Sequence, residues 1–366
     1  MSLTAGIVGM PNVGKSTLFN AITQSQVEAA NYPFATIQPN VGVVEVPDIR
    51  VDRLSEIFKP KKTIHTTIEF TDIAGLVKGA SKGEGLGNQF LSHIRETDAI
   101  VHVVRCFDDS TIIHVEDSVD PLRDIEIINL ELVLADLQTI ENRIAKVERK
   151  ALTKGKDADA EYLVLKKIFT ALMAGRSARS VELDKEETIL IKGFNFLSGK
   201  PVIYVANMSE EDISHPEDNQ YYQIVKKFAE SEHNDVIAIC AKIEEELAML
   251  EPAEKKEFLN ELGIHESGLD SIIKATYHLL GLCTYLTAGT DEVRAWTFKR
   301  GMKAPECAGV IHTDFQKGFI RAETYAYEDF IVLGSEQAVK DHGKMRSEGK
   351  EYLVQDGDVM NFRFNV

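Results

Sequence analysis

The sequence predicts an α/β protein with a doubly wound, mostly parallel sheet, an inserted antiparallel helical arm and a small, mostly β C-terminal domain. Three observations lead to this expectation. Strand-like and helix-like segments alternate over the first 125 residues, which is typical of a parallel sheet covered by helices. Two amphipathic helical segments then interrupt the alternation. From about residue 281 onward, short alternating runs replace the long apolar ones.

The strands of the sheet are expected in apolar runs, because strands covered on both faces carry few polar residues. Residues 99–104 (Ala-Ile-Val-His-Val-Val) form the clearest run. The other expected strands are residues 3–8, 41–46, 66–71, 201–206 and 235–240. Because two of these follow the amphipathic segments, the sheet domain is expected to comprise residues 1–127 and 193–280.

The inserted arm is expected over residues 128–192. Apolar side chains at helical spacing predict the buried faces of two helices. They are Leu130, Leu134, Leu137, Ile144 and Val147 in the first helix, and Leu165, Phe169 and Leu172 in the second. Residues 153–157 (Thr-Lys-Gly-Lys-Asp) read as the turn between them, so we expect two antiparallel helices. Residues 281–366 are expected to form the end domain.

Charge is unevenly distributed in this chain, whose formal net charge is −17. Residues 128–192 carry 12 Lys and Arg against 11 Asp and Glu, and residues 281–366 carry 11 against 13, so the acidic excess belongs to the sheet domain. An acidic surface repels phosphate backbones. Any nucleic-acid partner is therefore expected at the two near-neutral segments. The tip of the arm, 143–167, holds eight basic and four acidic residues. It is either a solvated face or a contact for nucleic acid or another partner.

Composition also restricts the class of protein. No apolar run reaches the length of a transmembrane helix, and the N-terminus lacks the features of a secretory signal. The four cysteines have no paired spacing, which favours reduced thiols over disulfides or a zinc site. We therefore expect a cytoplasmic protein.

The most informative motif is Gly-Met-Pro-Asn-Val-Gly-Lys-Ser at residues 9–16. It lies between an expected strand and an expected helix, which is the context of a phosphate-binding P-loop. The glycines allow a tight turn, so that loop N–H groups and the helix N-terminus face one anion. Lys15 is expected to reach the β- and γ-phosphates, and the hydroxyl of Ser16 is expected to bind Mg²⁺.

Two further segments fit the same chemistry. Asp72-Ile73-Ala74-Gly75 follows an expected strand, where Asp72 can hold Mg²⁺ through water and the N–H of Gly75 can bond the γ-phosphate. Thr36 lies in the loop before the next strand, and its hydroxyl is expected to complete the magnesium shell. The sequence fits either a threonine that binds Mg²⁺ or a loop threonine without that role.

The residue after Gly75 is Leu76, where many related NTPases place a glutamine that orients the attacking water. A leucine side chain has no polar group for that task. Either another group positions the water, or intrinsic hydrolysis is slow. His114 is the best candidate within the chain, although a histidine that merely packs fits the sequence equally well.

Base selectivity is expected at Asn207-Met208-Ser209-Glu210, after the strand 201–206. GTPases usually carry N-K-x-D there, with a carboxylate that accepts two bonds from guanine. Met208 replaces the lysine and Glu210 replaces the aspartate. A site that has lost such bonds loses its discrimination, so we expect a relaxed or inverted base preference, with ATP favoured over GTP or equal to it. Asn207 is expected to bond the purine edge.

Together with Cys240-Ala241-Lys242, these motifs resemble the YchF/Obg-like ATPase family of translation-factor-related P-loop NTPases over essentially the whole chain. The resemblance implies ATP hydrolysis, ribosome association and an end domain similar to the TGS domain, which has a β-grasp fold. It also implies phosphates cradled by Asn12, Val13, Gly14, Lys15, Ser16 and Thr17, a base contact at Met208, and Mg²⁺ at Ser16 and Thr36. His114 matches the histidine proposed to support hydrolysis in that family. Asn12 also resembles the loop of potassium-activated relatives, so K⁺ is a candidate cofactor.

Three functions are consistent with the sequence. The leading one is a slow ATPase switch on the translation machinery, stimulated by a partner. The second is a nucleotide-gated binding module for RNA or the ribosome whose hydrolysis is incidental. The third is a conventional GTPase.

Overall fold

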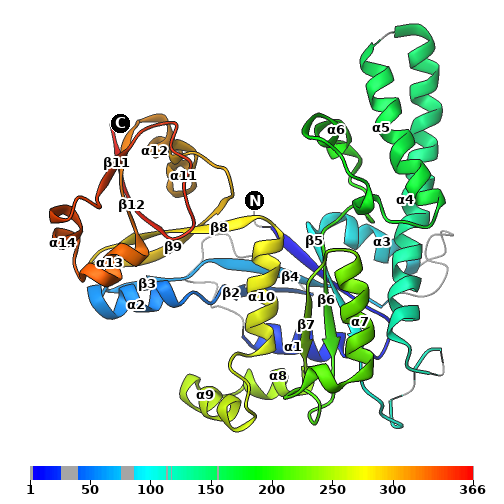
Figure 1. The fold of residues 1–366 in the computed structure, drawn as a ribbon, viewed down its shortest axis with the longest axis horizontal. Coiled ribbons are helices and arrows are strands. Elements are labelled where there is room, and N and C mark those ends of the chain that lie inside the picture. Colours follow the sequence, from blue (N-terminus) through cyan, green and yellow to red (C-terminus); the bar gives the residue numbers. More distant parts are fainter. Residues whose placement is uncertain are drawn as a thin grey trace. The chain divides into compact units, whose positions relative to one another are not determined.

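The computed structural model describes residues 3–25, 40–75, 86–112, 114–116, 118–154 and 156–365. The chain divides into two compact units (Figure 1). Of the described residues, 3–25, 40–43 and 69–276 belong to the first unit, and 44–68 and 277–365 belong to the second. Within the part of the chain that is described, no helix is long and apolar enough to cross a membrane.

The sheet of the first unit has the strand order β2-β4-β1-β5-β6-β7. The strands are β1 (Thr4–Val8), β2 (Val41–Glu45), β4 (Thr67–Asp72), β5 (Ala99–Arg105), β6 (Val202–Asn207) and β7 (Val236–Ile239). The pairs β4-β1, β1-β5, β5-β6 and β6-β7 are parallel. The backbone bonds from Asp72 N to Asn40 O and from Val46 N to Thr66 O give β2 the opposite direction. The predicted mostly parallel α/β architecture is confirmed.

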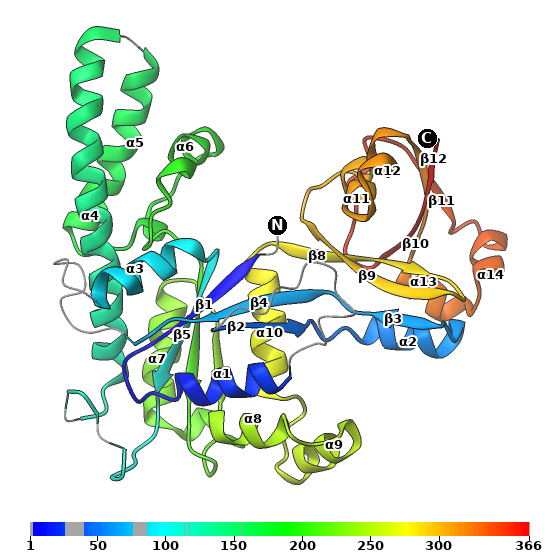
Figure 2. The same cartoon turned by 180° about the vertical axis from the view of Figure 1, so that it is seen from behind.

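Strand β5 lies in the middle of this sheet and is buried along its whole length, as its apolar sequence predicts. The helices of the unit are α1 (Lys15–Gln24), α3 (Leu86–Glu96), α7 (Gln220–Ser231), α8 (Ala241–Leu247), α9 (Pro252–Glu261) and α10 (Gly268–Leu279). Figure 2 shows them around the sheet. The carboxyl ends of β1, β5 and β6 lead into the loops that carry most of the predicted site residues.

The arm consists of α4 (Pro121–Lys154) and α5 (Lys156–Met173), which run antiparallel (Figures 1 and 2). It begins before the predicted residue 128. Short helical segments follow the arm: η3 (Ala178–Ser180), α6 (Lys185–Ile191), η4 (Lys192–Phe194) and, later in the chain, η5 (Pro216–Asp218). The helical hairpin itself agrees with the prediction, because its turn chemistry and periodicity are local properties of the sequence.

The predicted core face of α4 is partly wrong. Leu130 and Leu134 are 51% and 38% exposed. The residues that pack with α5 are Val133, Leu137, Ile140, Ile144 and Val147, against Val164, Leu165 and Ile168. A long helix that packs against different neighbours along its length has no single apolar stripe, so the leucine spacing pointed to the wrong side near its start.

A buried carboxylate holds the root of the arm. Asp136 on α4 accepts hydrogen bonds from the backbone N–H groups of Leu197 and Ser198, at 2.9 and 2.7 Å, and from Ser198 Oγ at 2.6 Å. Burial raises the pKa of Asp136, while these three donors oppose the shift. A buried carboxylate is tolerable only where its oxygens are bonded in this way, so the contact fixes α4 to the loop before β6.

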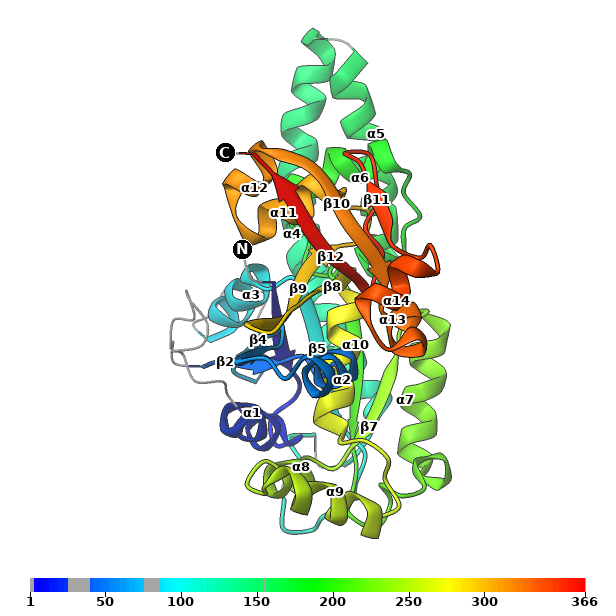
Figure 3. The same ribbon diagram turned by 90° about the vertical axis from the view of Figure 1, so that its left-hand side faces the viewer.

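The second unit is built on a sheet of order β11-β10-β12-β8-β9-β3. Its strands are β3 (Lys62–Ile64), β8 (Leu282–Ala288), β9 (Glu292–Lys299), β10 (Phe319–Ala326), β11 (Arg346–Glu348) and β12 (Asp358–Phe364). Its helices are α2 (Ile49–Phe58), α11 (Ala304–Ile311), α12 (Thr313–Lys317), α13 (Tyr327–Leu333) and α14 (Glu336–Asp341). Figure 3 shows β8, β9, β10 and β12 side by side. The parallel pair β12-β8 lies between antiparallel pairs.

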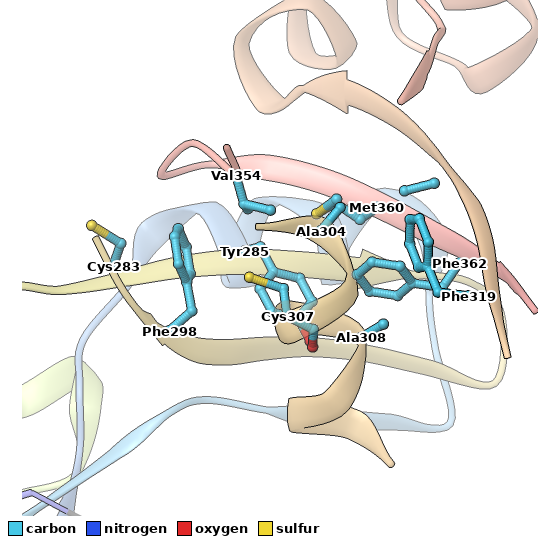
Figure 4. Close-up of a cluster of buried hydrophobic side chains, with 11 residues drawn as sticks. Cys283, Tyr285, Phe298, Ala304, Cys307, Ala308, Phe319, Val354, Met360 and Phe362 are labelled. Carbon is cyan, nitrogen blue, oxygen red and sulfur yellow. The ribbon is translucent and has the colours of Figure 1, made fainter. Parts of the chain in front are cut away.

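One core of this unit packs Tyr285 and Phe298 against Cys307 and Phe362 (Figure 4). All four cysteines of the chain are free and buried, as expected for reduced thiols. A second core adds Val51 and Leu54 of α2 to Leu286, Val293 and Phe330.

The predicted domain boundaries differ from the observed units at residues 44–68. The prediction placed this segment in the sheet domain, 1–127 and 193–280, and limited the end domain to 281–366. In the structure, α2 fills a core of the second unit and β3 pairs in parallel with β9, Lys62 opposite Glu292. Long-range burial decides this membership, and the local sequence carries no sign of it.

The arm offers a matched test of packing. Leu165 and Leu163 lie on the same helix, but Leu165 is fully buried in the arm core and Leu163 is 62% exposed. Leu165→Ala should lower the free energy of unfolding by about 2–5 kcal/mol. Leu163→Ala should change it by no more than about 0.5 kcal/mol. Hydrogen exchange of α4 and α5, together with thermal unfolding, measures both. Equal losses in the two variants would contradict the packing described here.

Candidate nucleotide-binding site

The loop between β1 and α1 has the geometry of an anion site. Asn12 and Gly14 adopt positive φ angles of 62° and 95°, which turn the backbone tightly before Lys15 opens the helix. Gly14 is the N-cap residue, no side chain caps α1, and no acidic residue lies in its first turn. The first N–H groups of a helix have no intrahelical partner, so those of α1 are available to an anion, which the helix dipole favours.

Gly14 also lies against the base-recognition loop. A Cβ on Gly14 would stand 2.2 Å from Nδ2 of Asn207, a distance that no real contact reaches. Glycine is therefore required here twice, by the backbone angle and by the approach of a neighbouring side chain.

Lys15 lies close to both Asp72 and Gly75. The side chain of Lys15 is 92% buried, and its Nζ donates to the carbonyl of Met10 at 3.1 Å. Burial lowers the pKa of Lys15, and the nearby Asp72 opposes the shift. A Cβ on Gly75 would lie 3.1 Å from Nζ of Lys15. The absence of a side chain at Gly75 thus leaves the ammonium room beside the loop.

Asp72 ends β4 with an unbonded oxygen. Its Oδ1 is buried and has no hydrogen-bond partner among the described residues. Burial raises the pKa of Asp72, while Lys15 lowers it. A buried carboxylate oxygen without a donor is costly unless a cation or water completes it, so the position fits Mg²⁺. The exposed Ser16 in the first turn of α1 supplies a hydroxyl. Thr36 and Leu76 lie outside the described residues.

A cleft of about 1110 Å³ opens beside this loop. It is lined by Asn12, Gly14, Lys15, Ser16 and Thr17, by Phe107, Asp108, Asp109 and Ile112 after β5, by residues 207–212 after β6, and by Cys240, Ala241, Lys242 and Glu245. Phosphate-binding and base-recognition segments therefore share one space. Val13 is not among these lining residues. It is buried, and its backbone carbonyl accepts a hydrogen bond from Asn207.

Asn207 braces the cleft. Its Nδ2 donates to the carbonyl of Val13 at 2.9 Å, and its Oδ1 accepts from the N–H of Ala241 at 2.9 Å. Its backbone carbonyl accepts from Cys106 at 2.8 Å. The prediction assigned Asn207 to the purine edge. The structure gives it the additional role of tying three loops together.

The neighbours of Asn207 shape the purine end. Met208 is buried, with its N–H bonded to the carbonyl of Ile239 at 2.7 Å. Glu210 is half-exposed and forms an ion pair with Lys242. Met208, Glu210 and Lys242 all line the cleft, and the carboxylate of Glu210 is paired with the ammonium of Lys242.

One wall of the cleft depends on Arg105, which sequence reasoning missed. Arg105 is 1% exposed and donates to the carbonyls of Phe107, Asp109 and Ile112 at 3.0–3.1 Å. These bonds fold residues 107–112 into the turn that lines the cleft. The available signal was an arginine directly after an apolar strand, where a charge needs several partners.

His114 is not among the residues that line the cleft, although Ile112, two positions earlier, is. Its Nδ1 accepts from the N–H of Glu116 at 3.1 Å, so the Nε2 proton is directed to Asp124 Oδ2 at 2.8 Å. The His114 ring is buried, and Asp124 lies in the first turn of α4. In this conformation both ring nitrogens are engaged, which is the arrangement of a packing histidine.

A glycine-rich loop that presents helix N–H groups and a buried lysine, with an aspartate at the end of the neighbouring strand, defines a P-loop nucleoside-triphosphatase. Comparison with known families agrees. Residues 4–138 match a family described as "50S ribosome-binding GTPase". Residues 282–365 match the YchF GTPase C-terminal family, described as a "Protein of unknown function".

Similar proteins narrow the class. The chain is 61% identical to a protein of Bacillus subtilis and 56% identical to one of Haemophilus influenzae, in each case over 100% of both chains, and both are named "Ribosome-binding ATPase YchF". A solved structure titled "Structure of the Schizosaccharomyces pombe YchF GTPase" matches with a TM-score of 0.89 and 42% identity, covering 99% of this chain and 98% of that one. The chain belongs to the YchF family.

The contact between Gly14 and Asn207 can be tested with a matched pair of glycines. Gly14→Ala should displace Asn207 and break its two side-chain hydrogen bonds. Triphosphate binding should then weaken at least tenfold, about the loss expected for one hydrogen bond to a charged group. Gly175 also has a positive φ, 72°, but nothing lies within 4 Å of its Cβ position. Gly175→Ala should carry only backbone strain and leave nucleotide affinity unchanged. Calorimetric titration with MgATP measures both, and equal affinities would exclude the proposed brace.

Proposed function

We propose that this chain is an ATP-binding and ATP-hydrolysing switch protein that binds the ribosome or its subunits, with slow intrinsic turnover that a partner stimulates. The observation that carries the proposal is the contrast within one cleft. Its phosphate end holds the loop with Lys15, which interacts electrostatically with Asp72, whereas its purine end has Met208 and a Glu210 paired with Lys242. The names of the bacterial relatives, ribosome-binding ATPases, support both halves of the proposal.

Base preference is the finer part of the proposal. A guanine-selective pocket pairs a free carboxylate with two guanine N–H groups, and such a pocket rejects other bases by about 10⁴ or more. In this chain the side chain at that position is longer by one methylene, and its carboxylate forms a solvent-exposed ion pair with Lys242. These contacts support ATP over GTP. The fission yeast relative is titled a GTPase, so the preference requires a direct measurement.

The chain's own residues would bind and orient the triphosphate. Lys15 and the N–H groups of residues 12–17 would hold the phosphates, and the N–H of Gly75 would bond the γ-phosphate. Ser16, Thr36 and Asp72 would hold Mg²⁺, which supplies charge neutralisation to the phosphates when bound. Asn12, whose positive φ turns the loop, is the residue through which we propose K⁺ stimulation.

Slow intrinsic turnover follows from the surroundings of the attacking water. Leu76 has no polar group, and His114 is bonded to Asp124 and Glu116. For His114 to orient water, as we propose for the stimulated state, its ring must leave Asp124 and turn toward the cleft. That requirement makes a partner-dependent rearrangement the rate-controlling event.

The alternative is a nucleotide-gated RNA- or ribosome-binding module with incidental hydrolysis. The buried His114–Asp124 pair favours it, because a histidine that never leaves this pair contributes nothing to turnover. Partner contacts are proposed at the arm, 143–167, and at the TGS-like domain, 281–366, where the acidic excess of the chain is absent.

Single-turnover ATP hydrolysis with and without purified ribosomes tests the function. We expect slow hydrolysis alone and stimulation by ribosomes, of the 10³–10⁵ order known for groups supplied by a partner. Lys15→Ala should lower the stimulated rate by about 10²–10³-fold, because it removes a charge that contacts the transferred phosphate. Ribosome binding without any stimulation would favour the incidental-hydrolysis alternative.

Base choice is tested by Met208→Lys combined with Glu210→Asp, which restores the usual GTPase residues. Affinity should move toward GTP by at least about tenfold, measured by competition between the two nucleotides. Glu211→Asp is the control, because Glu211 also lines the cleft but follows the recognition positions. An unchanged preference in the double variant would mean that another contact selects the base.

A further inference from the structure

A second groove lies in the first unit, outside the nucleotide cleft. It has a volume of about 270 Å³ and runs between α3 and α4, which lie side by side in Figures 1 and 2. Its lining is polar and is given by Asn88, Ser92 and Arg95 of α3 with Leu91, and by Gln138, Thr139 and Asn142 of α4 with Ala135. Among the described residues no carboxylate lines it, although the chain as a whole carries a net charge of −17.

Of the described residues that line the groove, Arg95 alone carries a charge. Its guanidinium is exposed and makes no hydrogen bond or ion pair with any described residue, whereas its backbone carbonyl accepts from Asn195 and Lys200. Arg95 interacts electrostatically with the buried Asp136, whose pKa burial raises and Arg95 helps to lower, but the two oxygens of Asp136 already accept three hydrogen bonds from other protein donors and none from Arg95. The planar fork of Arg95 is therefore available for two parallel bonds to an external anion.

The remaining side chains complement such an anion. Ser92 and Thr139 carry hydroxyls, and Gln138 and Asn142 carry amides that both donate and accept. Thr139 and Asn142 each give one donor to the preceding helical turn, at 3.0 and 2.8 Å, which holds them in place. Arginine with serine, threonine and amide side chains is the set that contacts phosphate and sugar in nucleic-acid complexes.

We propose that the α3–α4 groove binds the sugar-phosphate backbone of RNA, with Arg95 on a phosphate and the amides of Gln138 and Asn142 on ribose hydroxyls. The amides favour RNA over DNA, because a 2′-hydroxyl both donates and accepts. One cation among neutral groups fits a phosphodiester better than an acidic peptide, whose clustered carboxylates would need several cations. The inference rests on the proposed ribosome-binding function and assigns it a contact outside the arm tip.

The test compares two exposed arginines of the full chain. Fluorescence anisotropy with a labelled oligouridylate measures affinity across a salt series for the wild type, Arg95→Gln and Arg176→Gln. Arg176 follows α5, is exposed, and its side chain forms no hydrogen bond or ion pair within the described part of the chain. Arg95→Gln should bind several-fold more weakly, and the slope of log affinity against log salt should fall by about 0.7, the value for one phosphate contact on a single strand.

Arg176→Gln should keep the wild-type slope, and both variants should keep the wild-type rate of ATP hydrolysis and unfolding temperature. The matching oligodeoxyuridylate should bind the wild type more weakly than the RNA does. Three outcomes would overturn the inference. The two variants could lose RNA affinity equally, or Arg95→Gln could lose none. Arg95→Gln could also bind polyglutamate more weakly than the wild type does while its RNA binding is unchanged. Cosedimentation of the wild type with ribosomes is measured separately, so failure of the proposed function is distinguishable from failure of the groove.

Discussion

The site depends on the two hydrogen bonds of the Asn207 side-chain amide. It joins the P-loop at Val13 to the loop at Ala241, while its backbone holds Cys106. Asn207 is 4% exposed, so losing either side-chain bond would leave a buried polar atom unsatisfied, at about 1–3 kcal/mol. The bonds are possible only because Gly14 has no side chain. The close approach of two loops thus creates both the phosphate cradle and the purine end.

The surroundings of the cleft are built on the same principle of buried polar groups with complete partners. Arg105 is satisfied by three carbonyls, His114 by Asp124 and Glu116, and Asp136 by the loop before β6. Each of these contacts shapes a segment that has no regular secondary structure of its own. In a low-dielectric interior the hydrogen bonds of such groups are electrostatically stronger than in water. These bonds fix residues 107–112 and the loop before β6 to neighbouring elements.

Much of the fold and of the phosphate end was predictable from sequence, because the signals are local. The run before Gly9, the helix after Lys15 and the apolar strand at 99–104 each carry their own periodicity. The proposed roles of Lys15, Asp72 and Gly75 rest on their spacing relative to those elements. By contrast, Leu130 and Leu134 were assigned to the wrong face of α4. Periodicity reports that a helix has an apolar stripe, but the neighbours decide which part of it is covered.

The sequence by itself determined the class of the protein, its phosphate-binding chemistry and the departure of Met208 and Glu210 from a guanine-selective pattern. These are properties of residue type and order, which no packing can change. Only the tertiary structure decided that α2 and β3 belong with the C-terminal strands, that Arg105 forms a cleft wall, and that the His114 ring is bonded to Asp124. Such facts depend on contacts between residues far apart in the chain, and burial, rather than local propensity, selects among the partners that the sequence allows.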